Sequence, residues 1–278
     1  MKWLGRISVV SAAVMLGAAV LAGTALHGQA GRPAAAALPD WSGVWAMQGG
    51  TVFDRGTMKP PNAGVNTPDA REFPPYNAEW EAKYVANLKR VAGGTFPDPI
   101  STCGTPAGFP RLMNLPDTYE FALTPNATWI LTENGPNTMR IYTDGRAHPP
   151  ADELWGTYTG ASVGRWEGDT LVWTTVATKG SADNDVILDR TGLTLSDKAR
   201  ITTRMRKVDD MNLEAQMTID DPVSLTKPWV VTKRYRKMPP NTWVWDYACA
   251  ENNRNPISPT GRTLTTGPDG KILDKDAR

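Results

Sequence analysis

From about Tyr119 onward, apolar and polar positions alternate over short runs, as in strands with one buried and one exposed face. In the run 229–236, for example, Trp229, Val231 and Tyr235 share one face, and the opposite face carries Thr232, Arg234 and Arg236. The same pattern, rich in β-branched and aromatic residues, predicts strands at residues 119–123, 128–133, 139–143, 162–166, 170–177, 199–208, 213–219, 229–236 and 242–247.

Compact turn signals separate neighbouring runs. Glu167-Gly168-Asp169 lies between two of them, and Asp209–Asn212 and Met238–Asn241 lie between two other pairs. Short strands that recur every 8–12 residues indicate an antiparallel meander. The sequence therefore predicts a mainly β fold, closed as a lipocalin-like barrel or folded as a sandwich. The absence of a βαβ alternation argues against a doubly wound fold.

One segment before the strands has a helical period instead. Trp80, Tyr84, Leu88 and Val91 recur on one side, and Asn77 is a suitable N-cap residue. Gly93-Gly94 would end the helix, so a helix is predicted around residues 77–91. The proline-containing stretches 62–75 and 94–116 are predicted as loops.

The first thirty residues follow the pattern of an export signal. Lys2 and Arg6 precede an apolar run to Leu26, and Gly28-Gln29-Ala30 offers small residues at a cleavage site. An uncleaved N-terminal anchor is the alternative, because the apolar run approaches the length of a membrane span. We expect a signal peptide at 1–30, a linker at 31–39, a single β-rich domain at 40–256 and a C-terminal tail at 257–278. The protein would then be periplasmic or secreted.

The net charge of the chain adds little to these predictions. Cleavage after Ala30 leaves 28 basic and 29 acidic residues and a net charge of −1, without a basic block. No nucleic-acid partner is therefore expected. No other apolar run is long enough to span a bilayer, so no stable membrane insertion is expected after leader cleavage. A small-molecule ligand or substrate is the expected partner, and the oligomeric state is left open.

The two cysteines, Cys103 and Cys249, would most simply pair as a disulfide in an oxidising compartment, although two buried free thiols are the alternative. One histidine in the mature chain and two oxidised cysteines cannot provide a transition-metal site. Asp183-Asn184-Asp185 lacks the remaining ligands of a calcium loop. There is also no phosphate-binding loop and no haem motif, so no cofactor and no metal are expected.

Two resemblances to known proteins support the predicted fold. Gly43-Val44-Trp45, at the start of the first expected strand, resembles the opening of lipocalin-type barrels, in which a tryptophan plugs the closed end. Distinctive strings elsewhere resemble a family of exported bacterial proteins of unknown function, at residues 103–111, 140–149 (RIYTDGRAHP), 162–173 (SVGRWEGDTLVW), 221–229 (DPVSLTKPW) and 247–253 (YACAENN). That likeness covers roughly Asp40 to Asn253. It implies a secreted, mostly β single domain and brings no established catalytic residues.

His148 is the only histidine left once the leader is removed, and it lies just after a predicted strand. Asp144 and Arg146 are close to it in sequence, and Tyr142 lies near the end of that strand. An aspartate can orient an imidazole and an arginine can stabilise an oxyanion, so the group suits general acid–base catalysis. In the structural alternative, Asp144 closes a turn, Arg146 pairs with a surface acid, and His148 packs before Pro149.

Other residues are candidates for holding a ligand. Tyr142, Trp155 and Trp166 offer aromatic surfaces near loops, although a core position is the commoner role for tryptophan. Glu251 and Asn252 follow Cys249 and would lie close to the Cys103 loop if the disulfide forms. Ordinary turn and cap chemistry is the alternative for them and for the polar segment between two strands (Asp183, Asp185, Asp189, Ser196 and Asp197).

The sequence thus predicts an exported, cofactor-free enzyme, a lyase, isomerase or hydrolase acting on a small polar, aromatic or glycosidic compound. His148, Asp144 and Arg146 would be its catalytic residues. The main alternative is a periplasmic β-barrel that binds a small ligand without chemistry. A weaker alternative is an envelope protein that contacts a partner through its proline-rich loop and tail.

Overall fold

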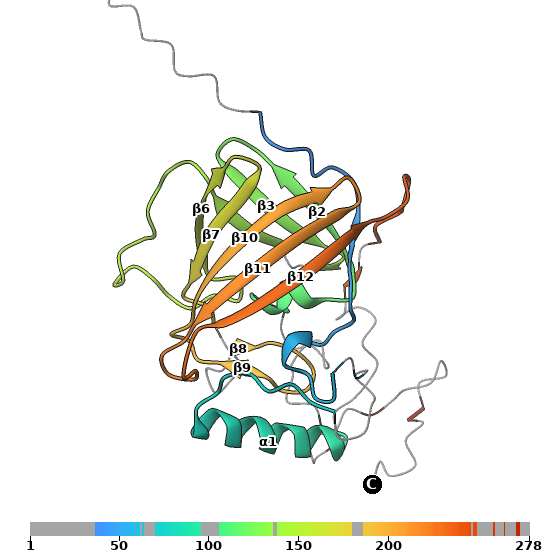
Figure 1. Ribbon diagram of the computed structural model, residues 1–278, viewed down its shortest axis with the longest axis vertical. Helices are drawn as coiled ribbons and strands as arrows, with labels where there is room; N and C mark the ends of the chain where they lie inside the picture. The colour runs from blue at the N-terminus through green and yellow to red at the C-terminus, as the bar shows by residue number, and fades with distance from the viewer. Residues whose placement is uncertain are drawn as a thin grey trace, which may run out of the picture. The chain divides into compact units, whose positions relative to one another are not determined.

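Nine strands pair in a ring and form a closed barrel in the computed structural model (Figure 1). The barrel confirms the mainly β prediction and decides between barrel and sandwich. Its strands, in order around the ring, are β1 (Trp45–Met47), β2 (Thr118–Leu123), β3 (Ala127–Thr132), β5 (Thr138–Tyr142), β6 (Ala161–Glu167), β7 (Thr170–Val176), β10 (Arg200–Asp209), β11 (Asn212–Asp220) and β12 (Trp229–Lys237).

The structure describes residues 37–61, 63, 70–95, 106–135, 138–179, 186–245, 247–248, 258, 264 and 271–272. Residues Ala37–Arg278 form one unit. The expected signal peptide lies outside the described residues, as do most of the linker and most of the tail. No helix among the described residues is long and apolar enough to cross a membrane.

One strand pair departs from the predicted antiparallel meander. β5 and β6 are parallel, with Tyr142 opposite Val163, and the eight other neighbouring pairs of the ring are antiparallel. An odd number of strands cannot close with every pair antiparallel, because the strand direction must return to its starting sense. Residues 143–160 therefore cross the barrel from one end to the other. We call this segment the crossover.

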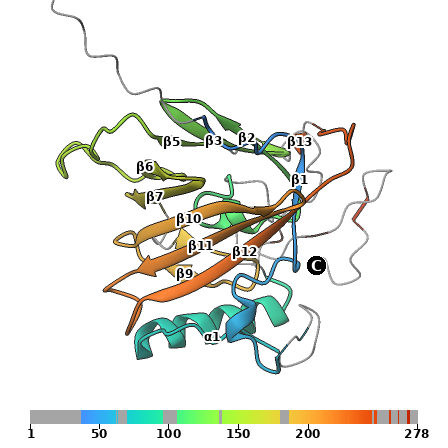
Figure 2. The ribbon, with the colours of Figure 1, turned by 45° about the horizontal axis from the view of Figure 1, so that its top comes forward.

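The two ends of the barrel differ in how the strands are joined. At the turn end, tight connections at 124–126, 168–169 and 210–211 link consecutive strands. At the helix end, long connections carry α1 (Ala78–Ala92) and the pair β8 (Val186–Ile187) and β9 (Thr194–Leu195) (Figures 1 and 2). The strands β4 (Asn134–Gly135) and β13 (Tyr247–Ala248) form a separate parallel pair outside the barrel ring.

Helix α1 confirms the predicted helix and its caps. The side chain of Asn77 accepts a hydrogen bond from the backbone N–H of Trp80 at 3.0 Å, and Gly93 is the C-cap. Trp80 and Tyr84 are buried from the predicted apolar stripe. The Asn77 amide also donates to the carbonyl of Val223, which ties the start of the helix to the connection between β11 and β12.

The turn end is closed by tryptophan side chains. Trp41 and Trp45 are buried, and the indole N–H of Trp45 donates to the carbonyl of Trp41 at 3.0 Å. The ring of Trp166 lies edge-on to Trp41, with centroids 5.3 Å apart. The tryptophan of the Gly43-Val44-Trp45 element is thus a core residue at this end.

A segment predicted as a loop fills part of the barrel interior. Within Pro106–Leu115, here called the inner segment, the 3-10 turn Arg111–Asn114 is wholly buried. The hydroxyl groups of Tyr119 and Tyr235, which point inward from β2 and β12, donate to backbone carbonyls of this segment, each at 2.8 Å. The barrel is therefore a packed scaffold along this stretch, because its own chain occupies the interior.

The predicted strand at 242–247 is wrong for the most part. Residues 242–245 carry no strand, and only Tyr247–Ala248 forms a short one, away from the barrel. Pro239 and Pro240 lack the N–H groups that a ladder needs. Asn241 has a positive φ of 66°, which turns the chain away from β12.

Candidate functional site

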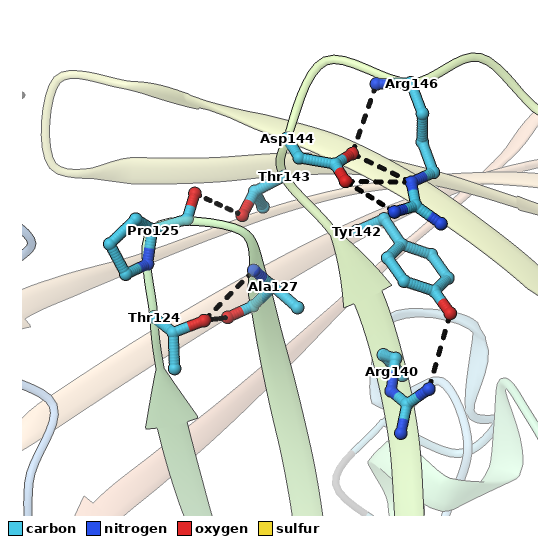
Figure 3. A network of polar contacts seen from close by, with 8 residues as sticks. All are labelled: Thr124, Pro125, Ala127, Arg140, Tyr142, Thr143, Asp144 and Arg146. Carbon is cyan, nitrogen blue, oxygen red and sulfur yellow. Dashed lines mark hydrogen bonds and ion pairs between the residues drawn. The ribbon is translucent and has the colours of Figure 1, made fainter. Parts of the chain in front are cut away.

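The sequence-predicted group at the turn end forms a local polar network (Figure 3). The carboxylate of Asp144 accepts from Nε of Arg146 at 2.9 Å and from its Nη2 at 2.5 Å. The Arg146 guanidinium lies 3.8 Å from the ring centre of Tyr142. Hydrogen bonding from Arg146 lowers the pKa of Asp144, and hydrogen bonding from Arg140 lowers the pKa of Tyr142. All of these partners lie on or next to β5.

His148 makes other contacts, farther along the crossover. Its Nε2 lies 3.0 Å from the carbonyl oxygen of Thr174 and 3.2 Å from that of Ala161. Carbonyl oxygens only accept, so Nε2 carries a proton and donates. The imidazole thereby fastens the crossover to β6 and β7, whereas the Asp144 carboxylate is bound by Arg146. A catalytic role for His148, Asp144 and Arg146 stays a prediction.

The other predicted ligand residues are not gathered at one place. Trp155 is 75% exposed on the crossover, and Trp166 is half-buried against Trp41. The remaining candidates lie outside the described residues: Cys103, Cys249, Glu251 and Asn252, with Asp183 and Asp185. Their predicted disulfide and ligand roles therefore stay predictions.

A cleft opens beside β12, beyond the end of the short strand β1. β1 pairs with only three residues of the nine-residue β12, and the chain after Gln48 then separates from its edge. The resulting cleft has a volume of about 470 Å³. Its walls include Val52, Phe53 and Arg55 on one side and Thr232, Lys233 and Arg234 on the other.

Lys233 is the unusual member of this wall. It occupies the inward-facing phase of β12 between Val231 and Tyr235 and is only 5% exposed. Its ammonium donates to the carbonyl of Val52 at 3.0 Å and to Oδ1 of Asn114 at 2.5 Å. Burial lowers the pKa of Lys233 to about 8, because the charged form is poorly solvated there.

A buried group of acids lies close to this lysine. Glu72 is 2% exposed, and its carboxyl oxygens accept from the backbone N–H groups of Phe53, at 3.2 Å, and Asp54. Oδ2 of Asp54 in turn accepts from the indole N–H of Trp229 at 2.7 Å. Burial, reinforced by the charge of Asp189, raises the pKa of Glu72 to about 9, so Glu72 is protonated at neutral pH.

Asp189 completes the acid group from the connection between β7 and β10. Its Oδ1 accepts from the N–H and the hydroxyl of Thr191, at 2.9 and 2.7 Å, and from the N–H of Leu193 at 3.3 Å. Burial raises the pKa of Asp189, while the hydrogen bonds from Thr191 oppose that effect. The helix end therefore brings Glu72, Asp189 and Lys233 together from three distant parts of the chain.

Sequence reasoning missed most of this group. Lys233 had a usable signal, since it interrupts an otherwise apolar face of its strand. Glu72 lay in a stretch interpreted as loop, and nothing in its sequence neighbours marks it as buried. For Asp189 the sequence leaves a ligand role and turn chemistry open, and its bonds to Thr191 are of the turn type. Its proximity to Glu72 could not be read from sequence.

Within the described part of the chain, no three histidine, cysteine, aspartate or glutamate residues are grouped so that they could hold a metal ion. The helix end offers a buried ammonium, buried carboxyl groups and an aromatic wall.

No family model and no curated protein matches the chain. Among solved structures, a single-residue mutant of the fluorescent protein UnaG is 15% identical, with a TM-score of 0.31, and the match covers 72% of this chain and 96% of that one. An abundant heat soluble (SAHS) protein of Ramazzottius varieornatus is 11% identical, with a TM-score of 0.30, over 71% of this chain and 95% of that one. At such identities and TM-scores the likeness supports no statement about function.

Proposed function

We propose that this protein is a binding barrel that holds a small aromatic or apolar carboxylate in the cleft beside β12, without chemical change. The observation that carries the proposal is Lys233, a buried ammonium in the cleft wall whose hydrogen-bond acceptors are both uncharged. An ammonium has three N–H donors, and two of them are used. The third can reach a ligand carboxylate.

The other walls of the cleft support an anionic ligand. Arg55 donates from Nε to the carbonyl of Gly49 at 2.5 Å, so its charge is not matched by an acid in that contact. Arg234 is paired with Glu214. None of the residues lining the cleft is acidic, and Phe53 supplies an aromatic wall. A cationic cleft with an apolar side favours a ring or short chain that carries one carboxylate.

Export belongs to this proposal, supported by the leader-like first thirty residues. A binding role is better supported than acid–base catalysis, because the described contacts of His148 and Asp144 are structural ones.

The test uses benzoate as the probe and benzamide as its uncharged counterpart, titrated into the mature protein by calorimetry. We expect saturable benzoate binding and an affinity for benzamide lower by about tenfold or more. Benzoate affinity should also fall as the pH rises through about 8, because Lys233 then loses its proton. Equal affinity for the two probes, or no benzoate binding, would contradict the proposal.

Two substitutions locate the site. Lys233→Met keeps the length of the side chain and removes the charge, and we expect it to weaken benzoate binding by about tenfold or more. Arg55→Gln changes an exposed residue of the cleft and should weaken binding without affecting the fold. Lys207→Met, at the turn end where Lys207 pairs with Asp210, is the matched control and should bind benzoate normally. A normal benzoate affinity in both cleft variants would overturn the assignment.

A further inference from the structure

A second cavity lies beneath the crossover, apart from the cleft. Its volume is about 560 Å³. Leu154 and Gly156 of the crossover form one wall, residues Val176–Lys179 after β7 form another, and Lys198 and Ala199, just before β10, form the third. We call this cavity the crossover pocket.

Thr178 gives this pocket a buried hydroxyl group. The residue is 1% exposed, and its Oγ1 has no hydrogen-bond partner among the described residues. An unmatched buried hydroxyl is unfavourable, and native proteins normally satisfy such a group with protein, water or ligand. Thr178 lines the pocket, so a molecule held there can supply the missing partner.

The backbone beside Thr178 is held in an uncommon conformation. Ala177 has a φ of +56°, in the left-handed region that residues with a Cβ seldom adopt. The conformation is fixed by two backbone hydrogen bonds to Thr157, one accepted by Ala177 at 3.0 Å and one donated by Lys179 at 2.7 Å. Such strain is often found at ligand-binding positions. Here it sets the position of Thr178 at the end of β7.

The charges around the pocket have partners of their own. The ammonium of Lys198 donates to Asp197 at 3.0 Å, and that of Lys179 lies 5.4 Å from the ring centre of Tyr158. The side chains of Lys198 and Asp197 are well exposed. The inner walls, by contrast, are apolar (Leu154, Val176, Ala177 and Ala199).

From this arrangement we propose that the crossover pocket is a second binding site, for an uncharged, mainly apolar molecule that carries one hydroxyl or carbonyl group. That group bonds Thr178, and the apolar body fills the space between Leu154 and Val176. This ligand class differs from the anion of the cleft, because the inner walls here carry no unpaired charge.

His148 acts on this pocket as a positioning residue. Its Nε2 bonds to the carbonyls of Ala161 and Thr174 hold the crossover against β6 and β7. The pocket wall begins at Ala151, three residues farther along the same segment, and includes Leu154. His148 therefore holds Leu154 and its neighbours in position without contacting the ligand.

The test compares 1-naphthol with 1-methylnaphthalene, which have similar shapes and differ in the hydroxyl group, by fluorescence titration of the mature protein. We expect 1-naphthol to bind more tightly, by about fivefold, the contribution of one hydrogen bond. Thr178→Val should abolish this preference, and Thr178→Ser should keep it. A preference that persists in Thr178→Val, or no binding of either probe, would overturn the proposal.

Further controls separate the two sites. Benzoate should not displace 1-naphthol, so displacement would mean a shared site and would count against a second one. His148→Ala should weaken 1-naphthol binding and leave benzoate binding unchanged, and His148→Gln, whose amide can donate to the same carbonyls, should restore part of the loss. Unchanged 1-naphthol affinity in His148→Ala would remove the positioning role. A negative benzoate experiment together with the expected 1-naphthol results would contradict the proposed cleft site and still support the crossover pocket.

Discussion

The two ends of the barrel both carry charged networks, but they are assembled differently. At the turn end, Asp144 and Arg146 are two residues apart in sequence and largely exposed. At the helix end, hydrogen bonds join Asp54 to Trp229 and Val52 to Lys233, across 175 and 181 residues. The first network is visible in a short string of sequence, and the second exists only once the barrel has closed.

The two networks also differ in burial, and burial changes the chemistry of their charged groups. At the turn end, water solvates Asp144 and Arg146, and the contact keeps both in their ordinary charged forms. At the helix end, burial moves the pKa of Glu72 up to about 9 and that of Lys233 down to about 8. Strongly shifted pKa values are typical of sites that bind or exchange charged ligands. The helix end of the barrel, which is harder to recognise in the sequence than the turn end, is therefore the stronger functional candidate.

Among the substitutions, the largest expected effect is that of Glu72→Ala. The substitution leaves the buried N–H groups of Phe53 and Asp54 without their acceptor. Each unsatisfied donor costs roughly 1–3 kcal/mol, so we expect a loss of about 3 kcal/mol in the free energy of unfolding. Urea denaturation followed by tryptophan fluorescence measures it. A loss below about 1 kcal/mol would mean that the helix-end network contributes little to stability.

Two glycines provide a matched comparison of the ends. Gly160, at the helix end of the crossover, has a φ of +67°, and an added Cβ would lie 2.6 Å from the carbonyl oxygen of Val176. Gly145, at the turn end, has a φ of +86° and open space around it. Gly160→Ala should cost about 2–3 kcal/mol, and Gly145→Ala only the backbone term of about 1 kcal/mol. Equal losses in thermal unfolding would contradict the close packing at Gly160.

Stability should also depend on pH through Glu72. Its pKa is raised from 4.5 to about 9 in the folded state, so the folded protein holds a proton that the unfolded chain releases. The stabilisation is complete below about pH 4.5 and is lost as the pH rises toward 9, with a slope of at most about 1.4 kcal/mol per pH unit. Lys233, whose pKa is lowered, acts oppositely above about pH 8. Denaturation at pH 5, 6, 7 and 8 measures the slope.

Glu72→Gln is the control for that experiment, because it cannot titrate. We expect the decline in stability from pH 5 to pH 8 to be much shallower in this variant. The same slope in wild type and variant would assign the pH dependence to another group.

The smallest effect is expected at the turn end. Asp144→Ala and Arg146→Ala each remove an exposed ion pair, which contributes little because water solvates both charges. The melting temperature should be close to that of the wild type for both variants. A clear decrease in either one would show that the network of Figure 3 has a structural role beyond its exposed position.

Much of the fold could be predicted from local patterns. The strand positions, the helix at Ala78–Ala92 and the tight turns follow from alternation, capping and turn residues, which depend on near neighbours. The candidate site could be predicted only in part. His148 was singled out for its rarity, but its partners Ala161 and Thr174 come from strands that local patterns do not place beside the crossover.

The sequence by itself determined the class of fold, because the period of apolar residues records which face of each strand is buried. Only the tertiary structure decided that the ring contains one parallel pair, that Pro106–Leu115 lies inside the barrel, and that Glu72, Asp189 and Lys233 meet. These features depend on how distant segments share one interior. The alternation along β12 marks Lys233 as inward-facing, but the environment that shifts its pKa is created by residues far away in the chain.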